Sequence, residues 1–162
     1  MADLKQAFGA STLITCTLAS LTSSLTAGRE STAVDNSSPN LFLDVMVHVA
    51  VKLQTGTPSS DRCVYVYAYG SEDGTNYTDN ATGSDAALTL RAPTNLRPLG
   101  QIQTPDAGGL TYKSGPMSLA AAFGGIIPRK WGIVIINSSG VTLSATEGDH
   151  TKSYTGIYYQ TV

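Results

Sequence analysis

Charged side chains are scarce in this chain. Asp, Glu, Lys and Arg make up 14% of its 162 residues, against roughly 25% in an average soluble domain. The 10 basic and 12 acidic residues give a net charge of −2 and form no basic block, so counterion release would add little to nucleic-acid affinity. We therefore expect no direct binding to nucleic acid, and we expect a partner to cover much of the uncharged surface.

Long hydrophobic runs are also missing. The stretch 7–25 is interrupted by Ser11, Thr12 and Thr15, which makes it too polar for the apolar part of a signal peptide. The run from Ile133 to Ile136 is far shorter than the about 20 residues of a membrane-spanning helix. The sequence therefore predicts no membrane segment.

Cysteine and histidine are too few to suggest a metal centre or a catalytic set. Cys16 and Cys63 have apolar or Thr neighbours, which favours two buried thiols and leaves a disulfide open. No Cys-x-x-Cys pair is present. His48 falls on the polar side of a predicted strand, and His150 follows Glu147 in a loop, so neither belongs to a recognisable motif. We predict a protein that is not an enzyme, with no catalytic residue, no metal and no cofactor.

Besides the pair Glu147 and Asp149 next to His150, acidic residues gather in the loop 70–85. Its carboxylates are Glu72, Asp73, Asp79 and Asp85. Calcium would require such oxygen ligands, but the spacing of an EF-hand is absent. Asp and Asn also stabilise turns through their own backbone, and we favour this interpretation. The sequence does not decide whether the loop 70–85 binds a ligand or an ion.

Strand patterns are abundant. Apolar residues occupy every odd position from Leu41 to Leu53, the period of a strand with one face in a core. Cys63 to Tyr69 alternates Tyr with Val and Ala in the same way. Further strands are predicted at 87–90, 95–103, 110–119, 131–137, 142–145 and 153–161. With about eight strands and no long amphipathic helix, the expected fold is all-β, a single antiparallel, jelly-roll-like β-sandwich.

The N-terminal region has a different character. Residues 4–10 fit a short helix or an irregular segment, and a Thr-rich strand is predicted from Ser11. Residues 27–30 are predicted to form a turn, and 31–36 a short edge segment. We therefore divide the chain into an N-terminal arm, residues 1–30, and a β-sandwich domain, residues 31–162.

Two surfaces are candidates for binding. The first is an apolar interface that would bury side chains of the arm, of the outer face of the long strand and of the loop 120–128. Its residues are Leu13, Ile14, Leu18, Leu21, Phe42, Met46, Phe123, Ile126 and Ile127. The second is a ligand face of alternating tyrosines that could stack on a carbohydrate or pack under a neighbouring subunit. Its residues are Tyr65, Tyr67 and Tyr69.

Three stretches together resemble a known class of protein. They are the segment Gly28-Arg29-Glu30-Ser31 to Val34-Asp35-Asn36, the strand and loop from Tyr65 to Tyr77, and the segment Phe123 to Ile136 with Pro128 and Trp131. As a set they resemble small β-sandwich, jelly-roll-like virion structural proteins of tailed bacteriophages, of the decoration or cement type. The motifs are turn and core patterns, so no site residue is transferred from them.

The resemblance implies a protein made in the host cytoplasm and assembled into the virion. It implies a trimer or similar homo-oligomer that sits on the major capsid protein or another virion protein, with the N-terminal arm linking neighbours. Two alternatives stay open: a carbohydrate- or receptor-binding module, suggested by the tyrosines and the loop 70–85, and a tail component such as a tube, adaptor or fibre-associated protein.

Overall fold

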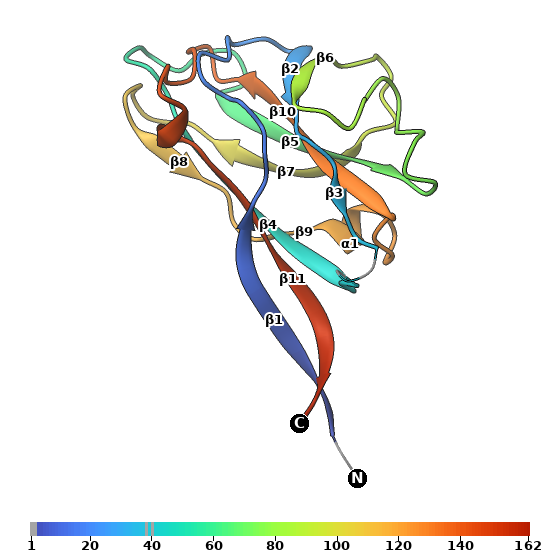
Figure 1. The fold of residues 1–162 in the computed structure, drawn as a ribbon. Coiled ribbons are helices and arrows are strands. Elements are labelled where there is room, and N and C mark those ends of the chain that lie inside the picture. The colour runs from blue at the N-terminus through green and yellow to red at the C-terminus, as the bar shows by residue number, and fades with distance from the viewer. Residues whose placement is uncertain (1–2, 38, 40) are drawn as a thin grey trace.

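Two antiparallel sheets packed face to face form the body of the protein (Figure 1). The computed structural model describes residues 3–37, 39 and 41–162. The first sheet contains, in order, β1 (Leu4–Leu13), β11 (Thr151–Thr161), β4 (Asp44–Lys52) and β8 (Thr111–Lys113), and β9 (Met117–Ser118) also pairs with β4. The second contains β6 (Ala86–Thr89), β2 (Ala27–Glu30), β10 (Lys130–Ser138), β5 (Cys63–Ser71) and β7 (Arg97–Gln103), with β3 (Val34–Asp35) on β10. The predicted all-β sandwich is confirmed.

The core lies between the sheets and follows the predicted alternation. Val45, Val47, Val49 and Val51 point into it from β4 and are fully buried. Trp131 of β10 packs edge-on against Tyr154 of β11, with ring centroids 5.2 Å apart. Burial of these side chains supplies the main favourable term for joining the two sheets.

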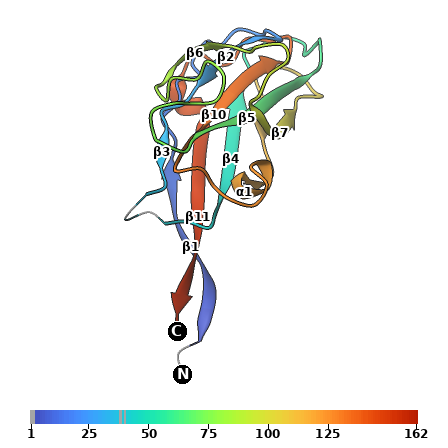
Figure 2. The same cartoon turned by 90° about the vertical axis from the view of Figure 1, so that its right-hand side faces the viewer.

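The central strand β10 is buried on both faces. Its residues from Trp131 to Ser138 are all buried, and Val134 and Ile136 belong to a second apolar cluster with Tyr69, Leu88 and Leu96. This cluster lies on the side of β10 that faces away from the main core, where the chain between β5 and β7 covers it (Figure 2). An uninterrupted apolar run is the expected pattern for a strand covered on both sides.

Several predicted elements were wrong in detail. Residues 4–10 are strand rather than helix, because they pair with β11. Residues 27–30 form β2 rather than a turn: a Cβ at Gly28 would collide with the backbone carbonyl of Ile135, so this glycine marks a close approach of two strands. The range 142–145 contributes only the isolated bridge between Leu53 and Leu143.

The predicted arm needs the largest correction. Ile14, Cys16 and Leu18 are buried in the main core, and β2 lies inside the second sheet. Residues 14–30 are therefore part of the sandwich, since Leu21 also packs against its core, although Leu25 is exposed. Of the described residues in the range 1–30, only β1 extends away from the body (Figure 1), while Met1 and Ala2 lie outside the described residues.

The two helical segments are α1 (Leu119–Ala122) and the 3-10 turn η1 (Glu147–Asp149). The Ser118 hydroxyl caps α1 by accepting a hydrogen bond from the Ala121 amide. Within the described ranges, no helix has the length and apolar character needed to span a membrane.

Candidate functional site

A two-stranded ribbon projects from the sandwich. It consists of β1 paired with the β11 residues from Ser153 to Thr161, and both views show it leaving the body with the two chain ends at its tip (Figures 1 and 2). Strand β4 accompanies β11 only as far as the pair Ile157–Asp44. Beyond this pair, no third strand lies beside the ribbon in the part of the chain that the structure describes.

One edge of the ribbon offers backbone groups for pairing. Asp3 and Val162 exchange two backbone hydrogen bonds, of 3.3 and 2.9 Å, and hydrogen-bonded pairs alternate along an antiparallel ladder. The register then directs the backbone N–H and C=O of Leu4, Gln6 and Phe8 away from β11. The sequence offers little of the usual protection against edge pairing, since β1 contains no proline and one charged residue, Lys5.

The ribbon also exposes apolar side chains. Leu4, Phe8 and Leu13 of β1 are 62%, 64% and 76% exposed, and Tyr159 of β11 is 60% exposed. Phe8 stands opposite Ile157, and Leu13 stands opposite Ser153 across the bulge between Phe8 and Ser11. Because Ile157 and Ser153 are four residues apart in β11, Phe8 and Leu13 lie on the same face of the first sheet. Exposed apolar side chains that cluster on one element are typical of an interaction surface.

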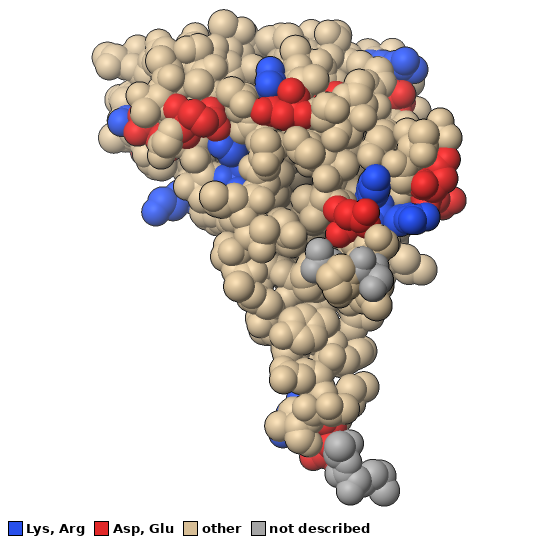
Figure 3. Space-filling model, in the orientation of Figure 1, with Lys and Arg blue, Asp and Glu red and all other residues tan. Residues whose placement is uncertain are grey.

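Charge is almost absent from the ribbon. No Asp, Glu, Lys or Arg occurs from residue 6 to 28 or from 153 to 162. On the face seen in Figure 3, charged side chains are distributed over the body, while the tapering part below it is uncharged nearly to its tip. A solvated surface without charges is poorly protected against association.

A hollow of about 360 Å³ lies where the ribbon joins the body. It is lined by Pro39, Leu41, Phe42, Tyr158 and Tyr159. The Phe42 ring packs between Tyr154 and Tyr158, at centroid distances of 6.3 and 6.4 Å. A Cβ at residue 156 would overlap the Phe42 ring, so Gly156 makes room for it. The hollow adds an apolar recess beside the ribbon.

The nine residues of the predicted interface do not form one surface. Leu13 and Ile126 are 76% and 80% exposed, but they belong to different elements. Those that are buried in the core or partly buried against it are Ile14, Leu18, Leu21, Phe42, Phe123 and Ile127. Met46 is half-buried on β4. Leu13 therefore belongs to the ribbon surface, whereas Ile14 and Leu18 stabilise the sandwich.

The predicted tyrosine face is smaller than expected. Tyr65 and Tyr67 are half-buried, with ring centroids 6.4 Å apart, and both line a hollow of about 280 Å³. Tyr69 is fully buried and donates a 2.6 Å hydrogen bond to the carbonyl of Ser31. Tyr69 thus cannot contact a ligand, because the loop after β5 covers it.

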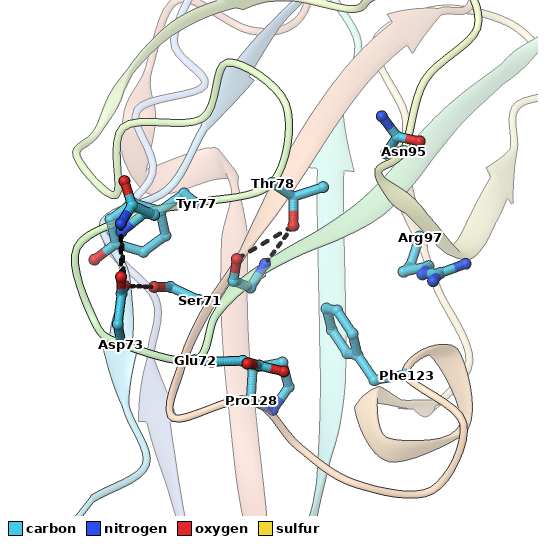
Figure 4. Close-up of a pocket in the computed structure, with 11 residues that line it drawn as sticks. Ser71, Glu72, Asp73, Tyr77, Thr78, Asn95, Arg97, Phe123 and Pro128 are labelled. Carbon is cyan, nitrogen blue, oxygen red and sulfur yellow. Dashed lines mark hydrogen bonds between the residues drawn. The ribbon is translucent and has the colours of Figure 1, made fainter.

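A larger hollow, of about 510 Å³, opens beside the end of β5 (Figure 4). Its lining comes from β5, the loop after it, the start of β7 and the segment after α1, and consists of Gly70, Ser71, Glu72, Asp73, Asn76, Tyr77, Thr78, Asn95, Arg97, Phe123 and Pro128. A Cβ at Gly70 would press on Pro128 and Phe123. Glycine at this position therefore lets both rings close over the backbone of β5.

Asp73 organises the loop beside this hollow. Its Oδ1 atom accepts hydrogen bonds from the backbone N–H groups of Thr75 and Asn76, each 2.8 Å long. The bonds from Asn76 and Thr75 hold the pKa of Asp73 well below its usual value. The carboxylate is therefore ionised at neutral pH, and it acts as the centre of a turn.

Asp79 and Asp85 attach the same loop to its surroundings. Asp79 accepts hydrogen bonds from Thr94 and from the backbone and side chain of Asn95. Asp85 pairs with Arg29 at 2.6 Å. Burial opposes ionisation at both aspartates, but these hydrogen bonds outweigh it and lower both pKa values. The interpretation of the acids as turn and loop anchors agrees with these contacts.

Glu147, Lys152 and His150 also have structural partners. The Glu147 carboxylate accepts hydrogen bonds from the Lys152 ammonium and from the backbone of Leu18 and Ala19. His150 contacts the carbonyl of Ser144 and the Lys52 amide. Among the described residues, no group of three or more His, Cys, Asp or Glu side chains is placed to hold a metal ion.

Both cysteines are buried free thiols. Burial, with the nearby Asp85 charge as a smaller cause, raises the pKa of Cys16 to about 12. The disulfide that the sequence left open is not formed.

Comparison with known proteins identifies no relative of this chain. No family model, no curated protein and no solved structure matches this chain. The ribbon and the hollow beside β5 are thus interpreted from their own chemistry.

Sequence reasoning missed the ribbon and the hollow for different reasons. The alternation of Leu4, Gln6 and Phe8 is too short and too polar to show that this strand pairs with the C-terminal one. The hollow combines Glu72, Arg97 and Phe123, which are far apart in sequence and share no motif. Their nearness depends on the pairing of β5 with β7 and on the turn after α1.

Proposed function

We propose that this protein is a non-enzymatic virion structural protein, of the capsid decoration or cement type, that self-associates through its ribbon and stabilises a phage particle. The observation that carries the proposal is the ribbon formed by β1 and β11, with its free edge and exposed apolar side chains. The resemblance of the three sequence stretches to phage virion proteins suggests the virion as the place of assembly, and the ribbon could form the contact between copies.

The ribbon has few contacts of its own to stabilise it. An isolated two-stranded ribbon is marginally stable in water, and this one extends beyond Ile157 with its β1 edge unpaired in the described structure. A further strand beside β1 would satisfy the backbone groups of Leu4, Gln6 and Phe8 and would cover the Phe8 ring. We infer that the strand is β1 of a second copy, because Lys5 is the one charged residue of β1 and few like charges would repel its copy.

The test is a pair of substitutions at Gln6. Because its N–H points away from β11, Gln6→Pro removes a donor from the free edge without breaking a β1–β11 hydrogen bond. Gln6→Thr keeps the donor and serves as the matched control. Size-exclusion chromatography with light scattering, over a range of concentrations, should show a defined oligomer for the parent and for Gln6→Thr, and a monomer for Gln6→Pro.

Two results would contradict the proposal. If the parent chain is monomeric at every concentration and does not bind a phage capsid, the ribbon is not an assembly element. If Gln6→Pro associates as well as Gln6→Thr, assembly uses another surface. A tail component would share the self-association but bind tail rather than capsid proteins, so cosedimentation with purified capsids and tails separates these two virion roles.

A further inference from the structure

We propose that the hollow beside β5 binds a neutral, hydroxyl-rich saccharide unit. This goes beyond the proposed assembly function, since the hollow is formed by the body of the protein and not by the ribbon. It also differs from the tyrosine face predicted from the sequence, because of those tyrosines none lines the hollow. Three features of the hollow support the proposal. They are two charged side chains without a protein partner, the half-buried Phe123 ring and the mixed charge of the lining.

Two charged groups of the hollow are uncommitted within the described structure. Both side chains are exposed to solvent, and neither the Arg97 guanidinium nor the Glu72 carboxylate makes a hydrogen bond or salt bridge to another described side chain. Both approach the hollow, from different sides (Figure 4). The guanidinium offers only donors and the carboxylate only acceptors. A hydroxyl group both donates and accepts, so a ligand with several hydroxyls can satisfy both.

The two amides of the lining are held in place. Asn76 donates to Asp73 at 2.6 Å, and Asn95 donates to Asp79 at 2.7 Å. Each amide thereby uses its NH₂ group and keeps its carbonyl oxygen available as an acceptor, with the orientation assigned from these bonds. Acceptors that are fixed before a ligand arrives reduce the entropy lost on binding.

The apolar part of the lining is a ring surface. Phe123 and Pro128 are half-buried, and both close over Gly70. Phe123 packs partly against the core and also lines the hollow (Figure 4). The C–H face of a sugar ring can stack on such an aromatic surface, while its hydroxyls reach the polar groups around it.

The mixed charge of the lining disfavours the competing ligands. An anion would approach Arg97 but would be repelled by Glu72 and Asp73. A cation would approach these carboxylates and the Phe123 ring, but Arg97, which lines the same hollow, would repel it (Figure 4). A largely apolar molecule would make few of the hydrogen bonds that the lining polar groups offer. A neutral ligand with many hydroxyls fits all of these groups.

NMR titration of the ¹⁵N-labelled full chain tests the proposal. The probes are glucose, galactose, mannose, N-acetylglucosamine, maltose and lactose, with glucuronate as the anionic and N-acetyl-lysinamide as the cationic probe. We expect at least one neutral sugar to shift the amide signals of Gly70, Ser71 and Thr78, and to do so more strongly than its epimer or either charged probe.

Two variants assign the binding to the hollow. Phe123→Leu keeps an apolar side chain against the core but removes the flat ring, and it should weaken binding about tenfold. Ile126→Leu alters a residue of the same loop that is 80% exposed and outside the hollow, and it should bind like the parent. Emission of the single tryptophan, which is fully buried, confirms that each variant is folded.

Three outcomes would overturn the proposal. The first is that no neutral sugar shifts these amides up to tens of millimolar. The second is that a charged probe shifts them more than every neutral sugar, which would assign the hollow to an acidic glycan or to a basic peptide side chain. The third is that Phe123→Leu binds as tightly as Ile126→Leu. None of these outcomes bears on self-association through the ribbon, so the two proposals fail separately.

Discussion

Phe8 and Ile157 stand opposite each other in the ribbon, yet the Phe8 side chain is 64% exposed and that of Ile157 only 5%. The difference follows from their neighbours. Ile157 lies between two strands, because it pairs with Phe8 on one side and with Asp44 on the other. Phe8 belongs to the edge strand, and the space beside it is where a further strand would lie.

The first prediction concerns Phe8. Phe8→Glu should abolish self-association, because it places a charge on the free edge, where charges oppose strand pairing. It should change the free energy of unfolding by less than about 0.5 kcal/mol, as the side chain is largely exposed. Light scattering measures the first effect and urea unfolding the second.

Ile126→Glu is the matched control for Phe8→Glu. Ile126 is equally apolar and 80% exposed, but it lies on the body of the protein. Association should be unchanged in this variant. Equal loss of association in both variants would indicate a general effect of charge and would argue against the ribbon.

The second prediction concerns Gly28. A Cβ at this position would overlap the backbone carbonyl of Ile135, which cannot move without disturbing the β2–β10 pairing. Gly28→Ala should therefore destabilise the fold by about 1–3 kcal/mol. Gly148→Ala is the control, because a Cβ there meets nothing within 4 Å. Thermal unfolding followed by tryptophan emission compares them, and equal midpoints would refute the packing argument.

The third prediction concerns acid stability. Burial alone would raise the pKa of Glu147, but hydrogen bonds from Lys152, Ala19 and Leu18 outweigh it and hold the pKa below its ordinary value of 4.5. A carboxyl group whose pKa is lower in the folded than in the unfolded state stabilises the fold at neutral pH. This contribution is lost as the pH falls through the region below 4.5.

Glu147→Gln tests this relationship. At pH 7 it should cost up to about 1 kcal/mol, because the nearly buried Lys152 ammonium loses its charged partner, while solvent screens the 40% exposed Glu147 side chain. At a pH well below 4 the parent and the variant should approach the same stability. Urea midpoints at several pH values measure the difference, and a cost that is independent of pH would contradict the assigned role.

The fourth prediction concerns thiol reactivity. The thiol of Cys16 is buried and its pKa is raised to about 12, so less than about one part in a thousand is thiolate at pH 8. A thiol-specific reagent should not label Cys16 in the folded protein at pH 8 but should label it quickly in urea. The Cys16→Ser variant shows which labelling belongs to Cys63. Fast labelling of the folded chain would show that the segment 14–18 opens.

The class of fold could be predicted from local sequence patterns alone. Alternating apolar residues from Val45 to Val51 and in β5 predict strands with one buried face, and this local period does not depend on which strands pair. The scarcity of charged residues also predicts association with a partner, although it does not indicate which surface is involved. Turn residues such as Asp73 were likewise interpretable from sequence, because their hydrogen bonds reach only two or three residues along the chain.

The positions of the two proposed binding surfaces depend on tertiary contacts. Leu13 is exposed whereas its neighbour Ile14 is buried, because the ribbon ends at Leu13 and the chain enters the body at Ile14. Pairing of β1 with β11 creates the free edge at Gln6, and pairing of β5 with β7 brings Arg97 toward Glu72 and Phe123. These contacts join residues distant in sequence, and local periodicity carries no information on which strands become neighbours.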